Sequence, residues 1–112
     1  MKNKKLYRGS GNIYEDLGFV DSEEMQAKAM LASRILTIIE EKQWTQSQAA
    51  EKLGIKQPKI SLLNRGQFSG FSLEKLIHLL NKLNQDIEIV VKQRPFPSRQ
   101  NGHVNVVYTH RS

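Results

Sequence analysis

The segment Thr45–Gly66 constrains the fold more than any other part of the chain, because it specifies two short helices and the turn between them. Thr45 and Gln48 have the T-x-x-Q spacing of a capping box, which marks the start of a helix. Gly54 follows at the distance at which a left-handed residue ends such a helix. A second helix is predicted from about 57 to 65, with Gly66 to end it, so two helices of eight or nine residues follow one another closely.

The apolar residues of these two helices predict that they pack against each other. Ala49, Ala50 and Leu53 form the inner face of the first helix, and the alanines allow a neighbouring backbone to come close. Ile60 and Leu63 form the inner face of the second. The other side of the second helix is predicted to point outward and carries Gln57, Pro58, Ser61, Leu62 and Arg65, with Lys59 on the flank. This is the spacing of a helix-turn-helix, whose second helix enters the major groove of DNA.

Two longer helices are predicted on either side of this motif. Asp21 can cap a helix that runs to about Lys42, and Ser72 can cap another that ends near Asn84. The expected apolar stripe of the first comprises Met25, Ala29, Ala32, Leu36 and Ile39, widened by Ile35 and Ile38. That of the last comprises Leu73, Leu76, Ile77, Leu80 and Leu83. The aromatic residues Trp44, Phe68 and Phe71 are expected to pack in the core.

The sequence after the last helix predicts a β-strand at 86–92, because Asp86-Ile87-Glu88-Ile89-Val90-Val91 is rich in β-branched residues. A lone strand leaves its backbone groups unpaired and therefore needs a partner. A short strand at 104–108 within the chain or the same strand of a second subunit could supply one. The domain boundaries that follow are a basic arm and loop at 1–20, a helix-turn-helix domain at 21–92 that ends in a dimerisation strand, and a basic tail at 93–112.

The positive charge lies at the two ends of the chain. The formal net charge is +6, yet residues 9–91 hold nine cations and eleven acids, so the excess comes from 1–8 and 92–112. Basic arms around a near-neutral body suit contact with a polyanion or simple solvation. There is no cysteine, no signal-peptide pattern and no membrane-length apolar run. We therefore expect a cytoplasmic protein without a membrane segment.

At this point the sequence resembles a known family. The run T-Q-S-Q-A-A-E-K-L-G-I-K-Q-P-K-I-S-L-L-N-R-G is similar to the helix-turn-helix of the lambda-repressor-like (XRE) family. The wider block over roughly 9–91 resembles its subgroup of HigA-type antitoxins, through G-S-G-N, G-F-S and Q-D. The resemblance implies a mainly α fold, a lambda-repressor-like domain of four to five helices with a C-terminal strand. It does not extend to the basic tails.

The resemblance also implies a set of DNA contacts. Gln46 is expected to meet a phosphate at the start of its helix, and Gln57 to read a base, since Gln can bond the edge of adenine. Leu62 either touches a thymine methyl or covers the edge of the core. The family often has Ser or Thr where this chain has Lys56, which weakens the cap of the recognition helix. The full expected set is Gln46, Lys56, Gln57, Pro58, Lys59, Ser61, Leu62, Asn64 and Arg65.

The function that follows is a sequence-specific DNA-binding transcriptional regulator, a homodimer on a palindromic operator. HigA-type resemblance implies that it is also the antitoxin and autorepressor of a type II toxin–antitoxin module, with a ribonuclease toxin as partner. A standalone XRE-type regulator without a toxin is the alternative. We expect no enzyme, since the sequence has no phosphate-binding loop or nucleophile elbow. No cofactor and no metal are expected, because the spacing of His103 and His110 fits no common site.

Overall fold

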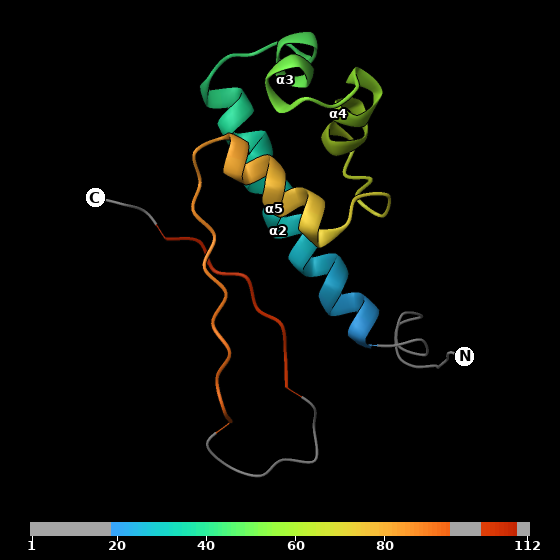
Figure 1. The fold of residues 1–112 in the computed structure, drawn as a ribbon. Coiled ribbons are helices and arrows are strands. Elements are labelled where there is room, and N and C mark those ends of the chain that lie inside the picture. Colours follow the sequence, from blue (N-terminus) through green and yellow to red (C-terminus); the bar gives the residue numbers. More distant parts are fainter. Residues whose placement is uncertain (1–18, 95–101, 110–112) are drawn as a thin grey trace.

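The structure is a computed structural model that describes residues 19–94 and 102–109. The described part contains four helices: α2 (Phe19–Glu41), α3 (Gln46–Leu53), α4 (Gln57–Asn64) and α5 (Leu73–Lys82). Helices α2 and α5 pack along each other, and α3 and α4 sit together at the end of this pair where α2 finishes (Figure 1). The basic arm predicted at 1–20 lies almost entirely outside the described residues, as do 95–101 and 110–112 of the predicted basic tail. The mainly helical prediction is confirmed.

The long helix α2 differs from its prediction at its start and in its buried face. It begins at Phe19, so Asp21 lies inside the helix and does not cap it. Met25, Ala29 and Leu36 are only half-buried. The residues of α2 that are buried are Ala27, Lys28, Ala32, Ile35, Ile38 and Ile39.

Lys28 explains why the buried face differs from the apolar pattern. Its side chain is only 9% exposed, and its Nζ lies 3.6 Å from a carboxylate oxygen of Glu24, one turn earlier. A lysine can bury its aliphatic stem while its ammonium stays at a polar partner. An apolar pattern counts lysine as a surface residue, so the predicted stripe includes Ala32, Ile35 and Ile39 but not Lys28.

All four described helices end in the same way. Each is followed by one residue in the left-handed region: Gln43 (φ 59°), Gly54 (φ 70°), Gly66 (φ 75°) and Asn84 (φ 64°). The next amide then donates to a carbonyl five residues earlier, as from Trp44 to Ile39, Ile55 to Ala50, Gln67 to Leu62 and Gln85 to Leu80. These paired bonds form the Schellman motif, which satisfies carbonyls that would otherwise be left without donors.

Helix α5 closes the core. Ser72 caps it as predicted, since its hydroxyl accepts a 2.9 Å hydrogen bond from the Lys75 amide. Leu76, Leu79 and Leu80 are buried against α2, together with Phe71 from the preceding loop. Phe71 is therefore a core residue as expected, and Trp44 and Phe68 are half-buried against the same cluster.

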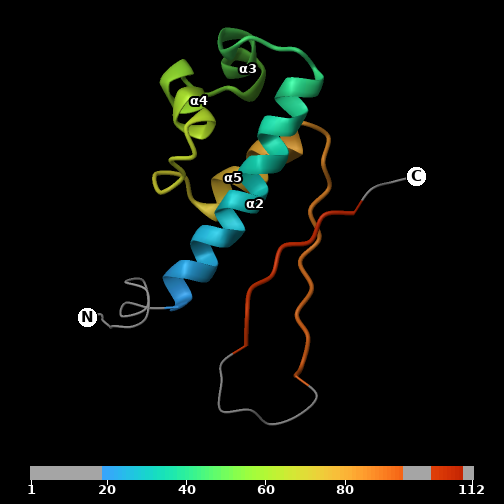
Figure 2. The same cartoon turned by 180° about the vertical axis from the view of Figure 1, so that it is seen from behind.

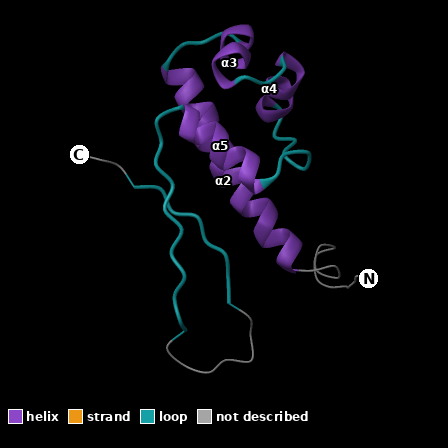
Figure 3. Cartoon of the chain, in the orientation of Figure 1, coloured by secondary structure: helices purple, strands orange, loops and turns teal. Residues whose placement is uncertain are grey.

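The two C-terminal segments, 85–94 and 102–109, form neither helix nor strand within the described part of the chain (Figure 3). The predicted strands at 86–92 and 104–108 are thus not confirmed. The first segment runs away from α3 and α4, and the second returns in the opposite direction (Figure 2). Ile87 alone in the first segment packs against the core.

Residues 102–109 lie along the outside of α2. The Glu23 carboxylate accepts a hydrogen bond from the Val104 amide at 3.3 Å and contacts the His103 ring, and the Arg34 guanidinium lies 4.2 Å from the centre of the Tyr108 ring. From Glu23 to Arg34 the helix rises about 16 Å. In an extended chain the five residue steps from His103 to Tyr108 span about the same length. The segment therefore follows α2 in the same direction and in an extended form.

None of the helices in the described part is both long and apolar enough to cross a membrane.

Candidate nucleic-acid interface

The first helix of the motif, α3, is held at its start by a complete capping box. The Thr45 hydroxyl accepts a 3.1 Å hydrogen bond from the Gln48 amide, and the Thr45 amide donates to Gln48 Oε1 at 2.8 Å. This confirms the predicted box and places Gln46 as the first helical residue, with an exposed side chain. The amide end of α3 and the Gln46 side chain are thus available together to a phosphate.

The inner faces of α3 and α4 are packed as predicted. Ala49 and Leu53 of α3 and Ile60 and Leu63 of α4 have no exposed surface, and Ala50 is 8% exposed. The small alanines let the two helices approach, which holds α4 at a fixed angle on α3. The orientation of the second helix therefore depends on this buried contact and not on the exposed residues.

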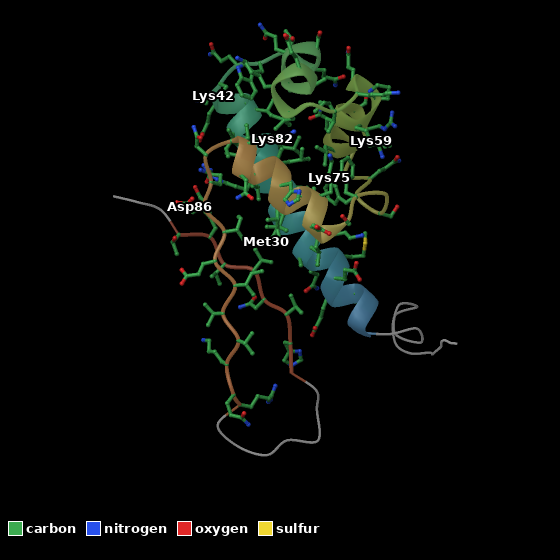
Figure 4. The ribbon with its side chains drawn as sticks, viewed as in Figure 1. Met30, Lys42, Lys59, Lys75, Lys82 and Asp86 are labelled. Atoms are coloured by element: carbon green, nitrogen blue, oxygen red, sulfur yellow. The ribbon has the colours of Figure 1, made fainter. Side chains whose placement is uncertain are left out.

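The turn between the two helices is fixed from a distant part of the chain. Gly54 takes the left-handed conformation, and Lys82 at the end of α5 donates a 2.9 Å hydrogen bond from Nζ to the Leu53 carbonyl (Figure 4). A cation at a helix C-terminus also suits the negative end of its dipole. Sequence reasoning missed this positioning residue, because nothing in the sequence links a lysine to a carbonyl 29 positions earlier.

The second helix, α4, presents the predicted outer face. Two of the expected contact residues, Ser61 and Leu62, are half-buried. The others are exposed: Gln46, Lys56, Gln57, Pro58, Lys59, Asn64 and Arg65. Pro58 lies in the first turn as predicted, and Lys56 at the cap position makes no side-chain hydrogen bond to the helix. The first turn of α4 contains no acidic residue. The structure thus brings these residues together on α4 and its flanks, with Gln46 on α3.

Two side chains of this face also contact the core. Leu62 packs against the hydrophobic cluster, which agrees with the interpretation that it covers the edge of the core. The Lys59 ammonium lies 5.2 Å from the centre of the Phe71 ring, on the side of α4 that faces the loop to α5 (Figure 4). A cation over an aromatic face is held by about 0.5–1 kcal/mol at an exposed site. Lys59 is therefore directed to the flank of α4, as its position on the helix predicted.

The surface has the composition of an anion-binding face. Lys52, Lys56, Lys59 and Arg65 are exposed on or beside α3 and α4, and no acidic residue occurs between Glu51 and Glu74. In the described ranges, no three His, Asp or Glu side chains come together as metal ligands would.

Comparison with known proteins identifies the fold. A family model described as a helix-turn-helix domain matches residues 13–92. A solved structure named "Putative XRE Family Transcriptional Regulator" is 43% identical, with a TM-score of 0.72, and the match covers 80% of this chain and 99% of that one. No curated protein matches the sequence. The chain therefore belongs to the helix-turn-helix domain family and, within it, to the XRE type.

Proposed function

We propose that this protein is a sequence-specific DNA-binding transcriptional regulator that acts in the cytoplasm as a homodimer on a palindromic operator. The observation that carries the proposal is the outer face of α4, which is free of acidic side chains and is held rigidly by Ile60 and Leu63. A helix held in this way can lie in the major groove while its exposed residues reach the base edges. In a dimer the two copies of α4 would lie about 34 Å apart, one turn of B-DNA.

The site residues divide into two roles. Gln57 begins α4 and is proposed to read a base, with Pro58, Ser61 and Leu62 beside it, and Lys59 on the flank of α4 is proposed to reach guanine acceptors or a phosphate. Gln46, Lys56, Asn64 and Arg65 are proposed to hold the phosphate backbone, because they lie at the ends of the two helices. The first group sets sequence preference, and the second sets affinity for any duplex.

The test is a pair of alanine variants measured on two DNA molecules, the promoter of the protein's own operon and a random duplex. Gln57→Ala is expected to lower affinity for the operator by about 1–3 kcal/mol and to leave the random duplex unaffected. Gln46→Ala is the matched control, since it removes a phosphate contact and should weaken both. An equal loss on both duplexes for Gln57→Ala would contradict its assigned role. Equal affinity of the natural protein for the promoter and for random DNA would contradict the proposal as a whole.

We further propose that the regulator is the antitoxin of a toxin–antitoxin module and represses their shared operon. This rests on the resemblance to HigA-type antitoxins and on apolar side chains left exposed outside the motif, among them Met30, Val104 and Val107. The experiment is co-expression with the product of the neighbouring gene. Co-purification and rescue of growth would support a ribonuclease toxin as partner. Specific promoter binding without either would favour the alternative, a standalone XRE-type regulator.

A further inference from the structure

The exposed large apolar side chains of the described residues are concentrated in the two C-terminal segments. Apart from Met30, they are Ile89, Val90, Val91, Val104, Val107 and Tyr108. Ile89 is 77% exposed and Val91 is 92% exposed, although Ile87, two residues before, packs against the core. Alternate residues of an extended chain share a face. The apolar face that begins on the core at Ile87 therefore continues beyond the helical domain, and no described residue of the chain buries it.

We infer that this face is covered by the same segment of a second copy, paired antiparallel about a two-fold axis that passes through Ile89. The inference rests on the proposed homodimer and specifies its register. In this register Val91 lies opposite the second copy's Ile87, and Ile89 lies opposite itself. Each exposed Val91 thereby reaches the core of the other subunit.

The charges of the segment agree with the same register. Asp86 and Lys92 are equally far from Ile89, so each carboxylate lies opposite an ammonium of the second copy, and the symmetry produces the pair twice. Gln85 and Gln93 form the outermost pair. Asn84 has a positive φ and residue 95 is proline, so the segment that can pair is bounded on both sides.

Two neighbouring registers keep the same face toward the core, and each fits less well. A two-fold axis at Glu88 places two carboxylates opposite each other, which is unfavourable. An axis at Val90 pairs Glu88 with Lys92 but leaves Ile87 opposite Gln93 and places Val90 against itself on the charged face. Exposed ion pairs contribute little, so the continuous apolar face decides in favour of Ile89.

The first test uses the absence of cysteine from the natural chain. In the proposed register the two Cα atoms of residue 89 lie about 4.5–5.5 Å apart, within the range that a disulfide spans. Those of residues 88 and 90 lie about 7–8 Å from their own copies. Mild oxidation of full-length Ile89→Cys should therefore give a covalent dimer, whereas the matched variants Glu88→Cys and Val90→Cys should stay uncrosslinked. Efficient crosslinking at 88 or 90 instead of 89 would overturn the register.

The second test reverses the charges. Asp86→Lys and Lys92→Asp should each raise the dimer dissociation constant about tenfold, measured by analytical ultracentrifugation. The double variant Asp86→Lys/Lys92→Asp should restore the natural value, because it exchanges the two charges across the same pair. An axis at Val90 predicts the opposite, since the double variant would then place the new lysine opposite Arg94 and the new aspartate opposite Glu88. Failure of the rescue would thus refute the pairing.

These outcomes are separable from the proposed function. Both Asp86 and Lys92 are exposed and lie outside α3 and α4, and circular dichroism reports whether each variant keeps its helices. Specific promoter binding by a dimer that crosslinks at none of the three positions would overturn the register and leave the regulator intact. Crosslinking at 89 without promoter binding would support the register and contradict the function.

Discussion

The contact between Gly54 and Lys82 allows the rigidity of the helix-turn-helix turn to be measured. An alanine at Gly54 would have to adopt φ +70°, and its Cβ would lie 2.9 Å from Lys82 Nζ. The left-handed backbone costs a residue with a Cβ about 1–2 kcal/mol. The flexible lysine would move aside and lose its bond to the Leu53 carbonyl, which adds about 1 kcal/mol at this partly buried position. Gly54→Ala should therefore lower the free energy of unfolding by about 2–3 kcal/mol.

Gly66 provides the matched control. Its φ is +75°, yet no atom outside its neighbours lies within 4 Å of the position that a Cβ would take. Gly66→Ala should thus cost only the backbone contribution, about 1–2 kcal/mol. Urea unfolding followed by circular dichroism would give both values.

A third variant isolates the lysine. In a Lys82→Met background the hydrogen bond is already absent, so Gly54→Ala and Gly66→Ala should cost the same. The reasoning is refuted if Gly54→Ala lowers the free energy of unfolding no more than Gly66→Ala does in the natural protein. It is also refuted if the larger effect of Gly54→Ala remains in the Lys82→Met background.

Three further predictions concern other parts of the molecule. Thr45→Ala should lower the free energy of unfolding by about 1 kcal/mol through loss of the capping box, whereas Ser47→Ala, an exposed residue outside the box, should change it by less than about 0.5 kcal/mol in urea unfolding. The hydrogen bond with His103 lowers the pKa of Glu23 from 4.5 and outweighs the opposing effect of burial, and the Val104 amide adds a smaller contribution in the lowering direction. The stability that ionised Glu23 contributes should therefore be fully present above pH 4.5 and be lost as the pH falls through the lowered pKa. The free energies of unfolding of the natural protein and of Glu23→Gln should thus differ at neutral pH and become equal in acid. If the Lys59 ammonium leaves the Phe71 ring for a phosphate, Lys59→Gln should reduce the slope of log K for promoter binding against log salt concentration by about 0.9. An unchanged slope would show that the ammonium stays on the ring.

Local signals made most of the fold predictable. Thr45, Ser72, Gly54 and Gly66 act within four residues of their own positions, and the structure places all four where the sequence predicts. The inward residues of α3 and α4 were predictable for the same reason, because a helix repeats its faces over a few residues. The outer face of the candidate site followed directly from them.

Features that depend on distant parts of the chain were not predictable. The pairing of Lys82 with the Leu53 carbonyl arises from the packing of α5 beside α3, and the burial of Lys28 is not signalled by an apolar pattern. Gln43 follows α2 in a left-handed conformation. Glycine or asparagine at this position would have indicated such a helix end in the sequence, but glutamine does not. The start of α2 differs from its prediction because Asp21, although a good capping residue, lies inside a helix that extends two residues further.

The turn at residues 83–85 restricts how the protein could acquire new target sites. Asn84 is left-handed, the Gln85 amide bonds the Leu80 carbonyl, and the Gln85 carbonyl accepts from Asn81, so the chain leaves α5 in one direction. In a two-fold assembly this direction sets the distance between the two reading helices. One inserted residue would turn Ile87 away from the core, since neighbours in an extended chain face opposite ways. Sequence changes in this protein should consequently alter the bases that α4 contacts more easily than they alter the distance between the two halves of the operator.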